Sequence, residues 1–421
     1  MQAVFAPVYD GRQKTIPPPN HKRFQITMKI CGIICEYNPF HNGHAYLLEK
    51  AKRESGCDAV ICVMSGNFTQ RGEPALFDKY TRARHAVLAG ADAVLELPTP
   101  FAVSPAEIFA KGAVKILNAI PAFDSLIFGG ENDDPQFFLD AAKQTSEESR
   151  EFKTALRAKL KEGISFTKAR NEALAETGKE QIARSLRSPN NILGVEYQRA
   201  LLAFGSDAKI IPVLRTGAEH TDTQMRKNFS SASAIRQAVR DGKLRPIKQN
   251  VPPFVYKDIR ERNSAENFQR FAHLTALTKS AEYFKNIIDC TEGLENRIKA
   301  FAKGAADYDE LIGKVTTKRY ISSRIRRILA SAVLDITADL VRKGLRAPLY
   351  LKILALKKSR AEDMLAALAQ ADFPLIVRKN DLSRLSKTAA EVYAKDLLAS
   401  DVYRICTGKT AERQRLPLVD G

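Results

Sequence analysis

The sequence is poor in cysteine and in long apolar runs, and each shortage excludes a class of protein. The six cysteines include no CxxC pair and have no spacing typical of a zinc site or a secreted disulfide framework, so we expect them to be reduced. No uninterrupted apolar run reaches the roughly 18 residues that a membrane span needs, and the amino terminus lacks the apolar core of a signal peptide. These shortages predict a cytoplasmic protein with no membrane segment.

Acidic residues are also in the minority. The 66 Lys and Arg residues against 48 Asp and Glu residues leave a net charge of +18 over 421 residues. A hydrophobic content of 44% is enough for two or three domains with proper cores, which excludes a disordered or collagen-like chain. The charge indicates a polyanionic partner such as nucleic acid or an anionic membrane surface, and a merely solubilising surface is the alternative.

Apolar runs alternate with helix-like segments from residue 28 onward. The strand-like runs are 29–37, 59–65, 92–98, 124–130 and 208–215. The first helices are expected at 44–55, 78–90 and 104–119. Near-continuous apolar strands between helices are typical of a parallel sheet that helices cover on both faces. The pattern predicts an α/β fold built on a Rossmann-like, doubly wound parallel sheet.

The same pattern suggests how the chain is divided. Residues 1–27, which carry a triple proline and no regular periodicity, are expected to be a flexible extension. The α/β domain is predicted at 28–245, with a helical insertion at about 134–187. Beyond residue 253 no comparable strand alternation survives, and Ala, Leu, Lys and Arg recur at helical spacing. Residues 253–421 are therefore predicted to form a basic, mostly α-helical domain.

Two of the six histidines, His41 and His44, follow the first predicted strand. Ligands of such a sheet bind beyond the carboxyl ends of its strands. Gly43 lets the backbone approach a ligand, and His44 opens a helix whose free amides and dipole favour an anion. The pair thus predicts a phosphate site; for an isolated HxxH the alternative is one capping and one packing histidine. Metal-binding histidines would more often be four residues apart, so no metal site is predicted.

The stretch His41–His44 also resembles the HxGH signature of the nucleotidyltransferase superfamily, whose histidines stabilise the transition state at the α-phosphate of ATP. The superfamily has a second, ISSxxxR-like signature, and "FSSASAIRQ" at 229–237 is similar to it. A serine cluster that caps a helix, with Arg236 one turn inside, suits the β- and γ-phosphates. The alternative is a plain serine cap with a solvent-facing arginine.

A narrower resemblance rests on longer segments. They are "KICGIICEYNPFHNGH" and the stretches 63–98, 128–132 ("FGGEN"), 188–197 ("SPNNILGVEY"), 317–330 ("TKRYISSRIRRILA") and 350–356 ("YLKILAL"). Together they resemble the bacterial tRNA(Met) cytidine acetate ligase family from Met28 almost to the end of the chain. The resemblance implies an enzyme that converts ATP and acetate, with Mg²⁺, to acetyl-adenylate. It then acetylates N4 of the wobble cytidine of elongator tRNA(Met).

The family's site residues map onto this chain as follows. His41 and His44 correspond to the catalytic pair. The ATP-binding segment corresponds to Ile34, Cys35, Glu36, Tyr37, Asn38, Pro39, Phe40, His41, Asn42, Gly43, His44, Ala45, Tyr46 and Leu47. Further ATP contacts are expected at Gly129, Asn191 or its neighbour Asn190, Arg215, Ser230, Ser231 and Arg236. The alternatives without a ligand are a turn role for Gly129, helix capping by the asparagine and a surface ion pair for Arg215.

Two further groups of residues are candidates for binding acetate or tRNA. The 65–74 loop at the end of the second strand, with Asn67, Gln70 and Arg71, is expected to shape the acetate pocket or receive the tRNA. Glu36 has three open roles: orienting His41 or Asn42, holding Mg²⁺, or a purely structural one. The cations expected to bind tRNA are Lys318, Arg319, Arg324, Arg326 and Arg327, with core ion pairs as the alternative for some of them.

Two other functions compete with the ligase. A small-molecule adenylyl- or cytidylyltransferase would share the fold, but it has no need of a large basic helical domain. A non-catalytic tRNA-binding protein would have no reason to keep both imidazoles and the glycine of the HNGH stretch. The oligomeric state cannot be deduced from the sequence.

Overall fold

The computed structural model describes residues 28–146, 149–215, 228, 230–259, 266–408 and 418–420. The extension predicted for residues 1–27 lies outside these ranges. None of the helices in the described ranges combines the length and the apolar character needed to cross a membrane.

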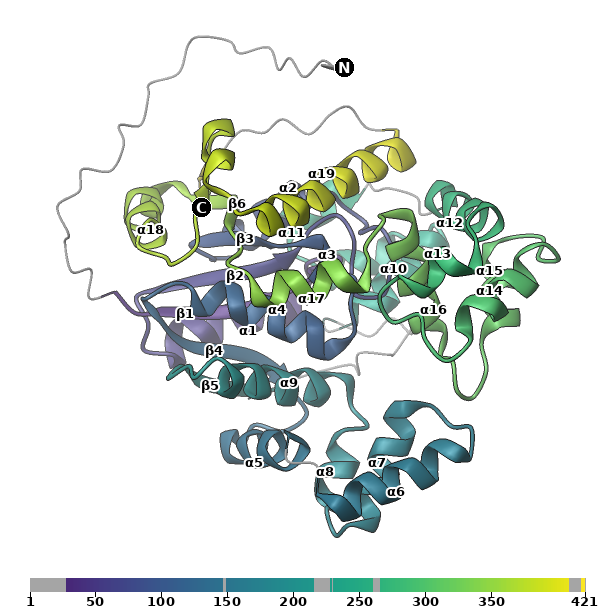
Figure 1. The fold of residues 1–421 in the computed structure, drawn as a ribbon. Coiled ribbons are helices and arrows are strands. Elements are labelled where there is room, and N and C mark those ends of the chain that lie inside the picture. The colour runs from purple at the N-terminus through teal and green to yellow at the C-terminus, as the bar shows by residue number, and fades with distance from the viewer. Residues whose placement is uncertain are drawn as a thin grey trace.

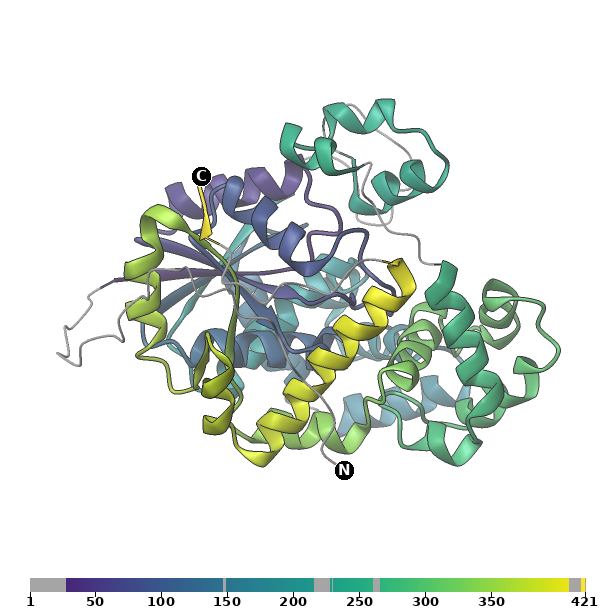
Figure 2. The same cartoon turned by 90° about the horizontal axis from the view of Figure 1, so that it is seen from above.

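A single mixed sheet lies at the centre of the molecule, with helices on both faces (Figures 1 and 2). Its strand order is β5-β4-β1-β2-β3-β6-β7, with β8 beside β6. Strands β1 to β5 span Ile30–Cys35, Ala59–Ser65, Ala93–Leu97, Phe123–Gly130 and Lys209–Leu214. These five strands are all parallel to their neighbours in this group. The predicted doubly wound α/β fold is confirmed, and the five strands lie close to their predicted positions.

The remaining strands come from the carboxyl-terminal half, where the sequence pattern indicates none. Strand β6 (Leu351–Lys357) pairs antiparallel with β3. Strands β7 (Leu375–Ile376) and β8 (Leu418–Val419) each pair parallel with β6. An apolar run as short as that of β6 fits a strand and a buried helix equally well, so its periodicity does not predict this strand. The part of the chain after residue 253 is mostly α-helical, as predicted, but it also adds these three strands to the sheet, and a domain boundary there stays a prediction.

Each face of the sheet has its own helices and its own core. One face carries α1 (Asn42–Glu54), α2 (Lys79–Leu88), α10 (Ala232–Arg240), η1 (Arg245–Gln249) and α11 (Pro253–Asp258). The other carries α3 (Thr99–Ala102), α4 (Ala106–Asn118), α9 (Pro189–Ala203), α17 (Ala338–Arg346), α18 (Ala361–Leu368) and α19 (Lys387–Thr407). In β1, Cys31 and Ile33 enter the first core, whereas Ile30 and Ile34 enter the second. This follows from the period of two along a strand.

Two helical groups extend beyond this sandwich. Helices α5 (Pro135–Ser146), α6 (Arg150–Lys161), α7 (Phe166–Glu176) and α8 (Glu180–Ser185) lie between β4 and α9, in the stretch predicted as an insertion. The end group comprises α12 (Glu266–Thr278), α13 (Ala281–Lys285), α14 (Leu294–Ala302), α15 (Tyr308–Val315) and α16 (Ser322–Val333). It lies beyond one end of the sheet in both views (Figures 1 and 2). The rings of Phe68, just after β2, and Phe268 on α12 are 5.1 Å apart, which places the end group at the carboxyl ends of the strands.

Candidate nucleotide site

The chain turns sharply between β1 and α1. Tyr37 has a positive φ of 49°, and the Asn38–Pro39 peptide is cis. The side-chain oxygen of Asn38 accepts a 2.7 Å hydrogen bond from the backbone N–H of Leu76. The side-chain amide of Asn42 donates to two backbone carbonyls, those of Asn228 and Gln249, at 2.9 Å each. These bonds fix the turn against loops from distant parts of the chain.

The two histidines of this turn are held by backbone amides. Nδ1 of His41 accepts from the Gly43 N–H at 3.1 Å, and Nδ1 of His44 accepts from the His41 N–H at 3.2 Å. The rings stack with centroids 3.6 Å apart and planes 19° apart. Because Nδ1 uses its lone pair in each ring, the proton of a neutral imidazole must lie on Nε2. Both rings are thus set to donate from Nε2 to an oxygen.

An open pocket lies next to these rings and encloses about 480 Å³, part of it in contact with solvent. Its walls come from the turn after β1, the ends of β4 and β5 and the segment before α10. The lining residues are His41, Gly43, His44, Tyr46, Leu47, Gly129, Val213, Leu214, Arg215 and Ser230. The structure therefore brings residues of both predicted signatures to one pocket. Val213 and Leu214 were not predicted, although their place beside Arg215 at a strand end could have indicated them.

Gly129 and Arg215 meet across the ends of β4 and β5. A Cβ added at Gly129 would lie 3.2 Å from Cγ of Arg215, so a side chain here would crowd the arginine. Burial lowers the pKa of Arg215, and the negative charge of Glu131 partly offsets that effect. A guanidinium that has lost part of its water interacts more strongly with an anion than a solvated one does.

The remaining residues of the predicted ATP segment build the turn and do not line the pocket. Ile34, Tyr37 and Phe40 are buried in the two cores. The carboxylate of Glu36 points to the neighbouring loop, where its Oε1 accepts from the Gln70 backbone N–H at 2.6 Å. The structure thus favours a role for Glu36 in holding this loop.

Asn190 and Asn191 also lie outside the pocket wall. The Asn191 side-chain oxygen accepts from the Glu131 N–H at 3.0 Å, and its amide donates to the Ser185 carbonyl at 3.3 Å. The Asn190 amide donates to the Glu131 carboxylate at 2.7 Å. Both asparagines therefore position the residue that follows β4, while the predicted ATP contact of Asn191 stays a prediction.

Residues of the second signature, at 229–237, also differ in whether they line the pocket. Ser230 lines the pocket, and its backbone N–H donates to the Asn250 side chain at 2.7 Å. Ser231 caps α10 by accepting from the Ala234 N–H at 3.0 Å. Arg236 donates to the Asn38 carbonyl at 2.6 Å and to the Ser233 hydroxyl at 3.2 Å, so it ties α10 to the turn. Burial, followed by the nearby charge of Arg71, lowers the pKa of Arg236 to about 10, so it is charged at neutral pH.

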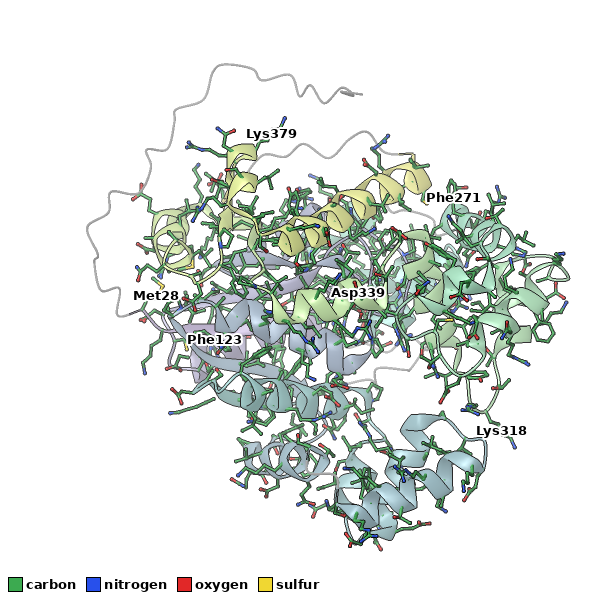
Figure 3. All side chains as sticks on the ribbon, viewed as in Figure 1. Met28, Phe123, Phe271, Lys318, Asp339 and Lys379 are labelled. Atoms are coloured by element: carbon green, nitrogen blue, oxygen red, sulfur yellow. The ribbon has the colours of Figure 1, made fainter. Side chains whose placement is uncertain are left out.

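Most of the cations predicted to bind tRNA are engaged in ion pairs. Arg324 and Arg327 pair with Asp289 at 3.2 and 3.1 Å, and their side chains are only 15% and 14% exposed. Arg319 pairs with Glu292 at 3.1 Å, and Arg326 pairs with Asp309 at 3.2 Å and Glu73 at 3.5 Å. These ion pairs support the alternative for the arginines of α16, and their contact with tRNA stays a prediction. Lys318 differs, because it projects from the outer tip of a loop (Figure 3) and has no ion pair within the described ranges.

Comparison with known proteins gives one consistent result. A model of the HIGH nucleotidyl transferase family matches residues 28–416. The tRNA(Met) cytidine acetate ligase of Caldanaerobacter subterraneus is 37% identical over 385 residues, which cover 90% of this chain and 95% of the relative. This chain belongs to the tRNA(Met) cytidine acetate ligase family. The enzyme of that name from Clostridium botulinum is also 37% identical, over 78% of this chain and 84% of its own length.

Solved structures agree with the sequence relatives. The crystal structure of Thermotoga maritima TmcAL in its apo form has a TM-score of 0.85 at 33% identity, and covers 92% of this chain and 96% of its own. The same protein bound with alpha-thio ATP has a TM-score of 0.84 at 32% identity with the same coverage. The names of the relatives favour the ligase over the alternative of a small-molecule adenylyl- or cytidylyltransferase with the same fold. The family resemblance found in the sequence is confirmed.

Proposed function

We propose that this ligase activates acetate with ATP and transfers the acetyl group to N4 of the wobble cytidine of elongator tRNA(Met). One observation carries the nucleotide half of the proposal: His41, Gly43 and His44 share a pocket with Gly129, Arg215 and Ser230. The name shared by the relatives supports the acetate and the tRNA. A cytoplasmic location, where tRNA and ATP occur together, belongs to the same proposal.

In the first half-reaction an acetate oxygen attacks the α-phosphorus of ATP, and pyrophosphate leaves. His41 and His44 donate Nε2–H to the oxygens of the α-phosphate, on which negative charge increases in the transition state. Arg215 attracts the phosphates, and the dipole of α1, whose amino terminus lies at the pocket, adds partial positive charge. The protein provides no covalent intermediate, so positioning and charge stabilisation supply the rate.

In this proposal Mg²⁺ binds to the protein together with ATP. Among the described residues, no group of three or more His, Cys, Asp or Glu side chains is placed to hold a metal ion. Mg²⁺ commonly keeps several waters and binds substrate phosphates together with one or two carboxylates. An ion bound mainly by the triphosphate would need few protein ligands, and it would neutralise charge on the leaving pyrophosphate.

In the second half-reaction the cytidine N4 attacks the acetyl carbonyl, AMP leaves, and the amine loses a proton. An exocyclic amine conjugated to its ring is a poor nucleophile, so a mixed anhydride is a suitable acetyl donor. The net charge of +18 favours an RNA substrate.

Two measurements test the proposal. Acetate should support the exchange of labelled pyrophosphate into ATP, and N4-acetylcytidine should appear in tRNA only when ATP, acetate and Mg²⁺ are all supplied. Exchange that is independent of acetate, or transfer of a nucleotide to a phosphorylated metabolite with no acetylated RNA, would instead support a small-molecule nucleotidyltransferase.

A further inference from the structure

The 65–74 loop is a compact structure that lies between the two halves of the chain. Within the loop, the Gly72 N–H donates to the Thr69 carbonyl at 2.9 Å and the Thr69 N–H donates to the Glu73 carbonyl at 3.0 Å. Phe68 and Pro74 form a β-bridge at its base. The loop is therefore tied together internally, and its position depends on the residues that contact its two sides.

Glu36 holds the inner side of the loop. Its Oε1 accepts from the Gln70 backbone N–H at 2.6 Å and from the Ser65 hydroxyl at 3.2 Å. Glu36 also lies two residues before Asn38, whose side chain accepts from the Leu76 N–H just beyond the loop. One carboxylate thus links the loop directly to the turn that carries His41 and His44.

The main chain at Glu36 is fixed independently of its carboxylate. The buried guanidinium of Arg82 donates to the carbonyl of Glu36 at 2.6 Å and to that of Ser65 at 3.1 Å. It also donates to the carbonyl of Gly66. These bonds join the ends of β1 and β2 through the backbone, so removing the Glu36 side chain should leave the strands in place.

Helix α16 of the end group holds the outer side of the loop. Gly72 has a positive φ of 73°, and an added Cβ would lie 2.5 Å from the Arg326 carbonyl oxygen and 2.6 Å from the Arg327 backbone nitrogen. The backbones of the loop and of α16 are therefore in direct contact. The Arg326 guanidinium also pairs with Glu73 at 3.5 Å and lies over the Tyr308 ring at 5.3 Å.

We propose that Glu36 is a positioning residue that sets the 65–74 loop against the catalytic turn, and that α16 holds the loop from the other side to complete the acetate side of the site. The inference rests on the proposed acetate activation. Under it, the end group contributes to the first half-reaction even when no tRNA is bound. This function is separate from any contact that the end group makes with RNA.

Two substitutions at Glu36 separate positioning from metal binding. Glu36→Gln keeps an oxygen that accepts from Gln70 but removes the charge, whereas Glu36→Ala removes both. In acetate-dependent pyrophosphate exchange without tRNA, Glu36→Ala should raise the KM for acetate about tenfold to a hundredfold, the range for losing a hydrogen bond to a charged acceptor. The KM for ATP should stay near wild type and the protein should remain folded at the assay temperature, and Glu36→Gln should restore most of the affinity for acetate.

Three results would overturn the inference. Glu36→Ala with an unchanged KM for acetate would show that the carboxylate does not position the acetate side. Equal defects in Glu36→Gln and Glu36→Ala that excess Mg²⁺ relieves would assign Glu36 to the metal. Equal rises in the KM for acetate and for ATP would indicate a general loss of structure. If the wild-type protein has no acetate-dependent exchange, the proposed function fails before Glu36 is tested.

The contact with α16 has its own test. Gly72→Ala puts a methyl group into the backbone of α16, and Gly56→Ala is the matched control because Gly56 has a φ of 66° with nothing within 4 Å of its Cβ position. Both variants carry similar backbone strain, so only Gly72→Ala should raise the KM for acetate without tRNA. Identical KM values in the two variants would refute the contribution of α16. If Gly72→Ala does not fold, the Glu36 variants still decide the positioning role.

Discussion

The turn after β1 and the helix α16 both carry polar or charged residues that are predicted to bind a substrate. The surroundings of these residues in the structure differ. At the turn, His41 and His44 stack beside a pocket that Arg215 and Ser230 also line. On α16, the arginines lie against Asp289, Asp309 and Glu73. A ligand-binding turn is defined by a local stretch of chain, so its chemistry can be inferred from that stretch. Whether a cation is available to a partner depends on acidic residues that are distant in the sequence.

The largest expected effect concerns the imidazoles. Replacing His41 or His44 by Ala should lower acetate-dependent pyrophosphate exchange by on the order of 10² to 10³, because each loses a donor that is already oriented toward the α-phosphate. His273→Ala is the control, since His273 bonds the Ala302 carbonyl within the end group. Near wild-type exchange in both single mutants would contradict the catalytic role proposed for the turn after β1, and the turn would then not differ from α16 in function.

The paired arginines should matter for stability more than for RNA. Arg324→Ala leaves Asp289 with one fewer partner in a largely buried pair, and we expect a loss of about 1.5–3 kcal/mol in the free energy of unfolding. Arg342→Ala is the control, because this arginine is exposed and its 3.8 Å contact with Asp339 is long, so its loss should change stability by less than about 0.5 kcal/mol. Denaturant unfolding measures both. A folded Arg324→Ala protein of normal stability that no longer binds tRNA would restore α16 as an RNA-binding surface.

Substrate choice tests the pocket near the turn. Acetate should support exchange better than propionate, since an extra methylene that does not fit costs about 1–3 kcal/mol in kcat/KM. The ratio of kcat/KM values for the two acids at saturating ATP is the measurement. Equal values would mean that the 65–74 loop does not close the acceptor side of the site.

The smallest effect is expected at Lys318. Its removal should weaken tRNA binding modestly and lower the slope of log affinity against log salt by about 1 if it meets one phosphate. Lys379→Ala is the matched control, because this exposed lysine lies on the opposite side of the molecule, on the short helix η4 (Lys379–Arg384) (Figure 3). Pyrophosphate exchange should be unchanged in both variants. Equal salt slopes for Lys318→Ala and Lys379→Ala would exclude this tip from the RNA interface.

Sequence reasoning succeeded where structure is decided locally. Buried parallel strands have a continuous apolar signal, and the HNGH stretch follows one of them directly, so the sheet and the pocket residues at the turn could be predicted. It failed where partners are distant. The short run at 351–357 gives no sign that it would pair with β3, and nothing near Arg236 indicates that it donates to Asn38. The carboxylate of Asp289, which holds Arg324 and Arg327, is likewise contributed by a separate loop.

The pairing of β6 with β3 also affects folding during synthesis on the ribosome. Ala93 pairs with Leu356, so the amino-terminal sheet must wait for most of the chain to leave the ribosome before that edge is closed. At about 5–20 residues per second, β3 remains an open apolar edge for many seconds. Such an edge is a template for pairing with other chains. A fragment ending at residue 245 would keep every residue that lines the nucleotide pocket, yet we expect it to aggregate as it is synthesised.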